Sequence, residues 1–279
     1  MCRSRVVPDE NRQRRPSNIV TLDLESDCAL SYQTNELWLE EVLLRDIANA
    51  VGTPVYCYST AILEANYRAL RDAFTGITPR ICYAIKANSN LAILRTLALL
   101  GAGADVVSEG ELRRALAAGV PGSRIVYSGV GKKRQEIEFA LQSRISQFNV
   151  ESEAELESIA EIASSIGEQA PVALRVNPDI DAGTIEKIAT GTQQTKFGIP
   201  KSRACHLYRQ IVEHPALDAQ GLSMHIGSQI TELEPFTIAF QQLAELAIKL
   251  GDSGLPVPRL DFGGGLGVVY DRETIPTFV

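Results

Sequence analysis

Short apolar runs alternate with longer amphipathic stretches along most of this chain. From about residue 80, a β-branched run is followed by a polar or glycine-rich corner and then by ten or more residues with helical spacing of apolar positions. This order is typical of strand and helix units that build a parallel sheet. The runs predict seven strands, at residues 81–85, 103–107, 124–128, 146–150, 171–176, 221–226 and 258–262.

The stretches between these runs carry helix signals. Two of them place apolar residues on one face, namely Leu156, Ile159, Ala160 and Ala163 in one, and Phe240, Leu243, Ala244, Ala247 and Leu250 in the other. Ser108 with Glu111, and Ser152 with Glu155, have the S-x-x-E spacing of a capping box. In such a box the two side chains bind exposed backbone amides at a helix start, so both pairs predict helix N-termini.

The segment before the first of these strands is of another kind. Residues 1–35 lack the apolar core of a secretory signal, and we expect them to form a disordered tail. The arginines in that tail are Arg3, Arg5, Arg12, Arg14 and Arg15. Residues 36–59 predict a lead-in helix over 36–51 and a short strand over 55–59, and a further helix is expected near 60–74.

Seven strands in this order predict an α/β fold of the TIM-like (β/α)8 barrel type over residues 36–279, incomplete at its C-terminus. Such a barrel closes with eight strands, and the chain reaches Val279 before an eighth. An unclosed barrel leaves two parallel edges unpaired, which favours aggregation. We therefore expect a fragment of a longer protein.

Composition narrows the function classes. Hydrophobic residues make up 45% and charged residues 22%, as in ordinary globular proteins, and the net charge of -7 gives no general attraction to nucleic acid or anionic lipid. No apolar run is long enough to span a membrane. The five cysteines form no C-x-x-C pair, which indicates reduced thiols and no zinc site. We expect a cytoplasmic protein that acts on a small molecule, without a metal.

A lysine follows the first strand. Lys86 lies in the segment YAIKAN, at the strand end where parallel barrels carry catalytic groups, between apolar residues that are expected to bury its stem. A lysine amine kept from water can form a Schiff base with an aldehyde. The alternative is a lysine that extends from a strand end into solvent.

A histidine and a hydroxyl follow the sixth strand, in the segment HIGSQ. Of the three histidines, His225 is the preferred candidate for a catalytic role, because His206 and His214 lie on a predicted surface helix. The hydroxyl of Ser228 can bind an anion. A histidine that only fills the core is the alternative for His225.

A glycine run follows the seventh strand, in the segment DFGGGLG. Gly263, Gly264 and Gly265 can present amides to an anion, and in barrels the loops after strands seven and eight commonly bind phosphate. A tight turn and a degraded dinucleotide fingerprint are the alternatives. Against the fingerprint, the acidic residue expected about 20 positions further on would lie beyond Val279.

Six segments of this chain occur in the order in which one enzyme family carries similar segments. They are YAIKAN (83–88), ADVVSEGEL (104–112), RVNP (175–178), TKFGI (195–199), HIGSQIT (225–231) and LDFGGGLG (260–267). Because of these segments, residues 36–279 resemble the fold-type III pyridoxal-phosphate-dependent decarboxylases. HIGSQIT and the stretch TGTQQTKFGI look like the diaminopimelate decarboxylase branch rather than the ornithine or arginine branches.

The resemblance implies pyridoxal 5′-phosphate as cofactor and assigns roles around its ring. Lys86 would bind the cofactor aldehyde and later take part in proton transfer. His225 would lie against one face of the pyridine ring, and Asp105 and Arg175 would belong to the inner pocket wall. Glu111 matches a family position near the cofactor, but the capping box already accounts for it.

The resemblance also implies a phosphate site, and this sequence departs from the family pattern in two respects. Ser228 and the amides of Gly263, Gly264 and Gly265 would bind the phosphate. The family pairs the pyridine nitrogen with a glutamate of an EPGR-like motif on strand eight, and this motif is absent here. Also absent is the C-terminal β domain, parts of which reach the partner subunit's site in the homodimer expected of the full-length family.

We therefore expect the decarboxylation of meso-2,6-diaminopimelate to L-lysine and CO2 in lysine biosynthesis, by a longer protein of which this chain is a truncated form. The alternatives are a non-catalytic pyridoxal-phosphate-binding barrel and a decarboxylase of another basic amino acid, of the ornithine or arginine type. The hypothesis of a nucleotide-dependent oxidoreductase rests on the glycine run alone.

Overall fold

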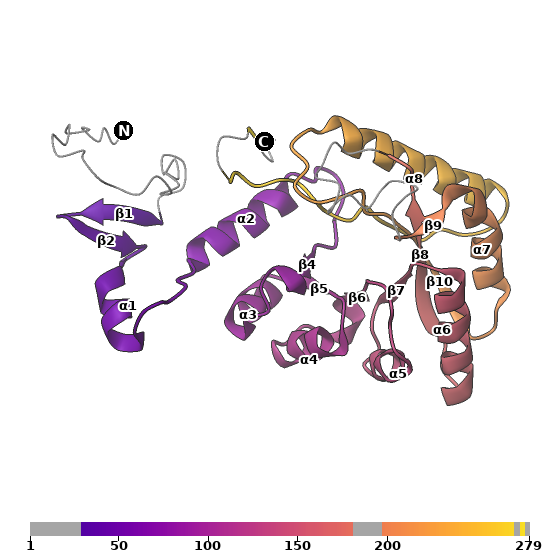
Figure 1. Ribbon diagram of the computed structural model, residues 1–279. Coiled ribbons are helices and arrows are strands. Elements are labelled where there is room, and N and C mark those ends of the chain that lie inside the picture. Colours follow the sequence, from indigo (N-terminus) through magenta and orange to yellow (C-terminus); the bar gives the residue numbers. More distant parts are fainter. Residues whose placement is uncertain (1–28, 181–196, 271–273, 277–279) are drawn as a thin grey trace.

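The computed structural model describes residues 29–180, 197–270 and 274–276. Its centre is a curved parallel sheet with the strand order β11-β10-β8-β7-β6-β5-β4, and β9 pairs with β8 at one end (Figure 1). These strands are β4 Cys82–Ala84, β5 Gly103–Val106, β6 Ile125–Tyr127, β7 Gln147–Val150, β8 Ala170–Asn177, β9 Ile199–Pro200, β10 Leu217–Ser223 and β11 Arg259–Asp261. The seven strands predicted from the sequence are all present, and the incomplete α/β barrel is confirmed.

Strand β10 begins earlier than expected, at Leu217 rather than residue 221. The pairing of β10 with β8 shifts register between Ala219 and Gly221, which interrupts the alternation along the strand. A side chain at Gly221 would place its Cβ 2.0 Å from the Arg259 carbonyl oxygen of β11. Glycine is therefore required there by the close approach of the neighbouring strand.

The helices that follow the sheet strands flank the curved sheet (Figure 1). They are α3 Leu91–Leu99, α4 Glu109–Ala117, α5 Arg134–Gln142, α6 Glu153–Ile166, α7 Lys201–Glu213 and α8 Glu234–Asp252, with short 3₁₀ turns η1 Ile85–Ala87 and η2 Gly122–Arg124. Strand residues such as Phe148 and Leu174 are fully buried against helix residues such as Ile159 and Ile211. The apolar faces of α6 and α8 predicted from their spacing thus form part of the core.

Both predicted capping pairs start a helix. The Glu111 amide donates to Ser108 Oγ at 3.2 Å, and the Glu155 amide donates to Ser152 Oγ at 3.1 Å. The carboxylates reach one residue further back than the usual box, since Glu155 Oε2 accepts from the Glu151 amide at 3.0 Å. Glu111 likewise accepts from an amide of the preceding strand connection, so its carboxylate serves the cap.

The lead-in helix expected over 36–51 is wrong in its first half. Residues there form β2 Glu36–Leu39 and β3 Val42–Leu43, and only α1 Leu44–Val51 is helical. Strand β1 Leu30–Gln33 pairs antiparallel with β2 through a two-residue turn in which both φ angles are positive. Such a turn closes a β-hairpin, and this pairing overrides the helical spacing of the apolar residues.

Two further expectations near the N-terminus need correction. The tail expected over 1–35 is wrong for Leu30–Gln33, which form β1, and residues 1–28 lie outside the described residues. Residues 55–59, expected as a strand, pair with no strand in the described part of the chain, and they lead into α2 Thr60–Asp72. Ser59 caps α2, accepting from the Ile62 amide at 3.0 Å.

The sheet is open, because among the described residues β4 and β11 each pair with one strand only. Unpaired parallel edges are templates for further strands, so we expect the 279-residue chain to self-associate. Size-exclusion chromatography with light scattering measures this, and a monodisperse monomer that melts cooperatively would contradict it. None of the helices in the described ranges is both long and apolar enough to cross a bilayer.

Candidate functional site

The carboxyl ends of the parallel strands gather polar side chains at one edge of the sheet. Parallel pairing sets Ala84 of β4 opposite Asp105 of β5, and Ser223 of β10 opposite both Arg175 of β8 and Asp261 of β11. Most of the predicted site residues therefore lie on strand ends or on the loops that leave them. We call this edge the mouth of the sheet.

Lys86 lies in the η1 turn directly after β4, as predicted, but its side chain is exposed. The neighbouring Ile85 is fully buried, so the expected burial holds for the adjacent apolar residue and is wrong for the lysine. The physical reason is that β4 is an edge strand of the described sheet, and only β5 covers it. The amine is thus open to a molecule that enters the mouth.

Asp105 presents a buried oxygen without a partner in the described part of the chain, its Oδ1. Burial is the largest cause that raises the pKa of Asp105 to about 6, and the charge of Asp261 adds to it. A hydrogen bond with Ser128 and the positive charges of Lys86 and Arg175 act in the opposite direction. The carboxyl group can therefore accept or donate a hydrogen bond near neutral pH.

His225 follows β10 and is half-buried at the mouth. Burial is the main cause that lowers its pKa to about 4, followed by the positive charges of Arg175 and Lys86. The amide of Gly264 lies 3.5 Å from its Nδ1, at the outer limit of a hydrogen bond. The imidazole is consequently neutral at pH 7 and offers a flat, uncharged face.

The glycine run after β11 makes a turn that other residues could not make. Gly263 and Gly265 have φ of 68° and 116°. A Cβ at Gly265 would lie 2.0 Å from the Gly227 carbonyl oxygen, and one at Gly263 would lie 2.5 Å from the Met224 carbonyl oxygen. Around Gly264 no atom of the described residues lies within 4 Å of such a Cβ, so this part of the chain leaves space at the middle of the turn.

The Gly263 amide is already engaged, because it donates to Asp261 Oδ1 at 2.9 Å. Only the following part of the turn can therefore present its amides to an anion without breaking this bond. The turn is also tied to the loop after β10. The Ile230 amide donates to the Gly265 carbonyl and the Gly267 amide to the Ile230 carbonyl, both at 2.9 Å, which brings half-buried Ser228 into the same unit.

Alanine at Gly265 is expected to destabilise the protein by about 2–3 kcal/mol, because the residue must keep a positive φ and its Cβ would overlap a carbonyl oxygen. The matched control is Gly264→Ala, where a Cβ meets open space. Urea unfolding measures both free energies. Equal effects of the two variants would show that the turn does not have the described geometry.

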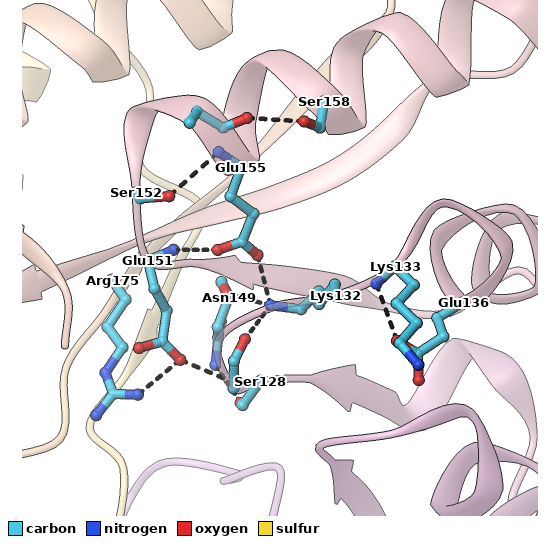
Figure 2. A network of polar contacts seen from close by, with 12 residues as sticks. Ser128, Lys132, Lys133, Glu136, Asn149, Glu151, Ser152, Glu155, Ser158 and Arg175 are labelled. Atoms are coloured by element: carbon cyan, nitrogen blue, oxygen red, sulfur yellow. Dashed lines mark hydrogen bonds and ion pairs between the residues drawn. The ribbon is translucent and has the colours of Figure 1, made fainter. Parts of the chain in front are cut away.

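Sequence reasoning missed three polar residues at the mouth: Asn149, Glu151 and Asp261. The Asn149 amide group donates to Ser128 Oγ at 3.0 Å and to Asp261 Oδ2 at 2.9 Å. Figure 2 shows Glu151 beside the Arg175 guanidinium, with Lys132 and Glu155 next to it. The signal was present, because all three lie at or just after predicted strand ends, where a barrel carries its site.

Arg175 is buried, and its guanidinium carbon lies 5.2 Å from the centre of the Phe197 ring. Phe197 belongs to the predicted TKFGI segment, whose first two residues lie outside the described residues, as does most of TGTQQTKFGI. The structure places Lys86, Asp105, Arg175, His225 and the glycine turn at or just after the carboxyl ends of the strands, and their roles stay predictions.

Comparison with known proteins gives matches over most of the chain. Residues 60–278 match the family described as "Pyridoxal-dependent decarboxylase, pyridoxal binding domain". A diaminopimelate decarboxylase from Vibrio cholerae is 49% identical over 247 residues, which is 88% of this chain and 59% of the relative. One from Pseudomonas aeruginosa is 48% identical over 246 residues, with 88% and 59% covered. The chain thus spans about three fifths of the length of these relatives.

Solved structures agree in fold. Diaminopimelate decarboxylase from Helicobacter pylori, complexed with L-lysine, superposes with a TM-score of 0.82 at 41% identity and covers 84% of this chain and 60% of its own. The enzyme from M. jannaschii, in complex with L-lysine, has a TM-score of 0.83 at 36% identity, with 89% and 59% covered. The fold and the matched segment agree, and this chain belongs to the pyridoxal-dependent decarboxylases, with its pyridoxal-binding domain over residues 60–278.

Proposed function

We propose that the mouth of the sheet binds pyridoxal 5′-phosphate through Lys86, and that the protein decarboxylates meso-2,6-diaminopimelate to L-lysine and CO2. The observation that carries this proposal is the convergence of Lys86, Asp105, His225 and the glycine turn on one edge of a pyridoxal-dependent decarboxylase domain. In parallel α/β folds this edge is the usual place of catalytic groups.

The residues at the mouth fit the cofactor. The buried Asp105 Oδ1 still needs a hydrogen-bond partner, and the turn at Gly264 leaves room for a phosphate. Lys86 is exposed at the mouth, where its amine can bond to an aldehyde. When bound, the cofactor supplies the electron sink for the charge that remains when CO2 leaves.

Each side chain then has a proposed task. Lys86 holds the cofactor and can later move a proton at the substrate α-carbon. The neutral imidazole of His225 covers one face of the pyridine ring and keeps water from it. Ser228 and the amides of Gly264 and Gly265 bind the phosphate, for which the Gly264 amide gives up its 3.5 Å contact with His225 Nδ1, and Gly263 shapes the turn.

Diaminopimelate is the proposed substrate because the relatives at 48% and 49% identity carry that name. L-lysine, present in the related structures, is what diaminopimelate becomes when it loses one carboxylate as CO2. The proposal extends to lysine biosynthesis, a homodimer and a cytoplasmic location. Cys57, Cys82 and Cys205 are free thiols, which supports a reducing compartment.

A non-catalytic cofactor binder is the second candidate. The printed sequence holds no EPGR-like segment, so a carboxylate for the pyridine nitrogen is not evident in it. Without such a partner the ring nitrogen is less readily protonated and withdraws electrons less strongly.

Release of labelled CO2 from carboxyl-labelled substrates tests the proposal. The full protein that contains this chain, loaded with pyridoxal phosphate, is expected to act on meso-diaminopimelate at least about 100-fold faster than on ornithine or arginine, since these two lack the second carboxylate that the site must match. Faster release from ornithine or arginine would overturn the substrate. Cofactor binding without any CO2 would favour the second candidate.

A further inference from the structure

Glu151 joins two strand ends at the mouth through one carboxylate oxygen. Its Oε1 accepts from the Gly129 amide at 2.9 Å and from the Arg175 guanidinium at 2.9 Å. Gly129 follows β6, Glu151 follows β7 and Arg175 lies on β8, so this oxygen links three neighbouring segments of the sheet (Figure 2).

The pair is buried, with 10% of the Arg175 side chain and 1% of the Glu151 side chain exposed. The second oxygen, Glu151 Oε2, is buried and has no partner in the described part of the chain. Burying a carboxylate with an unused oxygen costs free energy, and apolar residues of similar size would commonly be at least as stable. The pair therefore needs an explanation other than stability.

The backbone amide of Glu151 is also hydrogen-bonded. Its amide donates to Glu155 Oε2 at 3.0 Å, and Glu155 Oε1 lies 2.5 Å from Lys132 Nζ. Lys132 in turn donates to the Gly129 carbonyl at 2.6 Å. The donor and acceptor groups around the Glu151 carboxylate are thus fixed before any ligand binds, which is the arrangement expected of groups that orient a site.

We infer that Glu151 is the positioning residue for Arg175, and that it holds the guanidinium at the mouth where, on the proposed function, the cofactor ring binds. Arg175 is buried at the mouth among two carboxyl groups, Asp105 on β5 and Asp261 on β11. His225 after β10 and Lys86 after β4 belong to the same edge. Its charge acts on both Asp105 and His225, although burial is the larger influence on each. A guanidinium that left this position would change the charge around the cofactor.

Titration of the full protein that contains this chain with pyridoxal phosphate, followed by absorbance, tests the inference without measuring activity. Glu151→Gln and Arg175→Gln are each expected to weaken binding about tenfold, the loss of one charged hydrogen bond. Because Glu151 acts through Arg175, the double variant is expected to bind no more weakly than Arg175→Gln alone. Additive losses, or wild-type affinity of Glu151→Gln, would overturn the inference.

The pH midpoint of the absorbance of the bound cofactor separates positioning from a structural role. Arg175→Gln removes a positive charge and should raise this midpoint by about one unit. Glu151→Gln lets the guanidinium leave its position, so it should raise the midpoint too, by no more than Arg175→Gln does. A lowered midpoint in Glu151→Gln would show a direct effect of the Glu151 charge, and an unchanged midpoint would show a merely structural role, and either result would overturn the inference. Glu151→Asp keeps the charge and should keep the wild-type midpoint, and a shift of about one unit in this variant would overturn the inference even if Glu151→Gln failed to fold.

Glu153→Gln is the matched control, because Glu153 pairs with Arg203 at 2.9 Å on the exposed surface of the same segment. It is expected to leave affinity and midpoint unchanged. If the full wild-type protein binds no pyridoxal phosphate, the proposed function fails. If the full wild-type protein binds and Glu151→Gln matches it, only the role of Glu151 fails.

Discussion

The Lys86→Ala variant is expected to lose all covalent attachment of pyridoxal phosphate after borohydride reduction, since no other amine replaces the one at the end of β4. Mass spectrometry of the intact chain measures the added mass in the wild type and its loss in the variant. Stability should change by less than about 0.5 kcal/mol, because the side chain is exposed.

The control for this experiment is Lys249→Ala, on the exposed side of helix α8. It removes a lysine outside the mouth and should keep the label at the wild-type level. Full labelling of Lys86→Ala, or a label that spreads over several lysines in the wild type, would contradict the assigned role.

The second large effect concerns stability. Lys132→Met is expected to lower the free energy of unfolding by about 3–5 kcal/mol, because it leaves a buried carboxylate without its counter-ion. The Lys132 side chain is 1% exposed and that of Glu155 is 10% exposed. The variant also loses the bonds from Lys132 to the carbonyls of Gly129 and Asn149. Urea unfolding at pH 7 measures the loss.

The pH dependence of this loss has a defined sign. Burial already raises the pKa of Glu155, with Lys132 acting against it, so removing Lys132 should raise this pKa further. The folded variant then takes up a proton at higher pH than the unfolded chain, and the loss should shrink as the pH falls from 7 towards 5. A loss independent of pH would show that the ion pair is not its cause.

The exposed pair of Arg203 and Glu153 provides the comparison, with about half of each side chain in solvent. Arg203→Met should cost no more than about 1 kcal/mol, since solvent screens such pairs. Similar costs for Arg203→Met and Lys132→Met would contradict the burial argument.

The strands could be predicted because a buried parallel strand needs a run of apolar residues and a turn signal at each end, and both are local in sequence. The N-terminal hairpin could not be predicted in the same way. Its residues Leu37, Leu39, Val42 and Leu43 suit a helix or two strands, and the choice depends on pairing with β1.

The site was predicted where a residue type was itself unusual, as with Lys86 at a strand end or three glycines in a row. Glu151 was missed because its neighbours Ser152 and Glu155 form a capping box, which explained the acidic residues there. Its partner Arg175 lies 24 residues further along the chain, and only the alignment of β7 with β8 brings them together. The exposure of Lys86 depends on β4 being an edge, which spacing alone does not reveal.

A crystal structure of the chain with pyridoxal phosphate tests the central claim most directly. The account predicts continuous density from the cofactor aldehyde carbon to Lys86 Nζ, the ring against His225, and the phosphate at Gly264 and Ser228. Density for the cofactor elsewhere, or a Lys86 amine directed into solvent away from both His225 and the glycine turn, would contradict it.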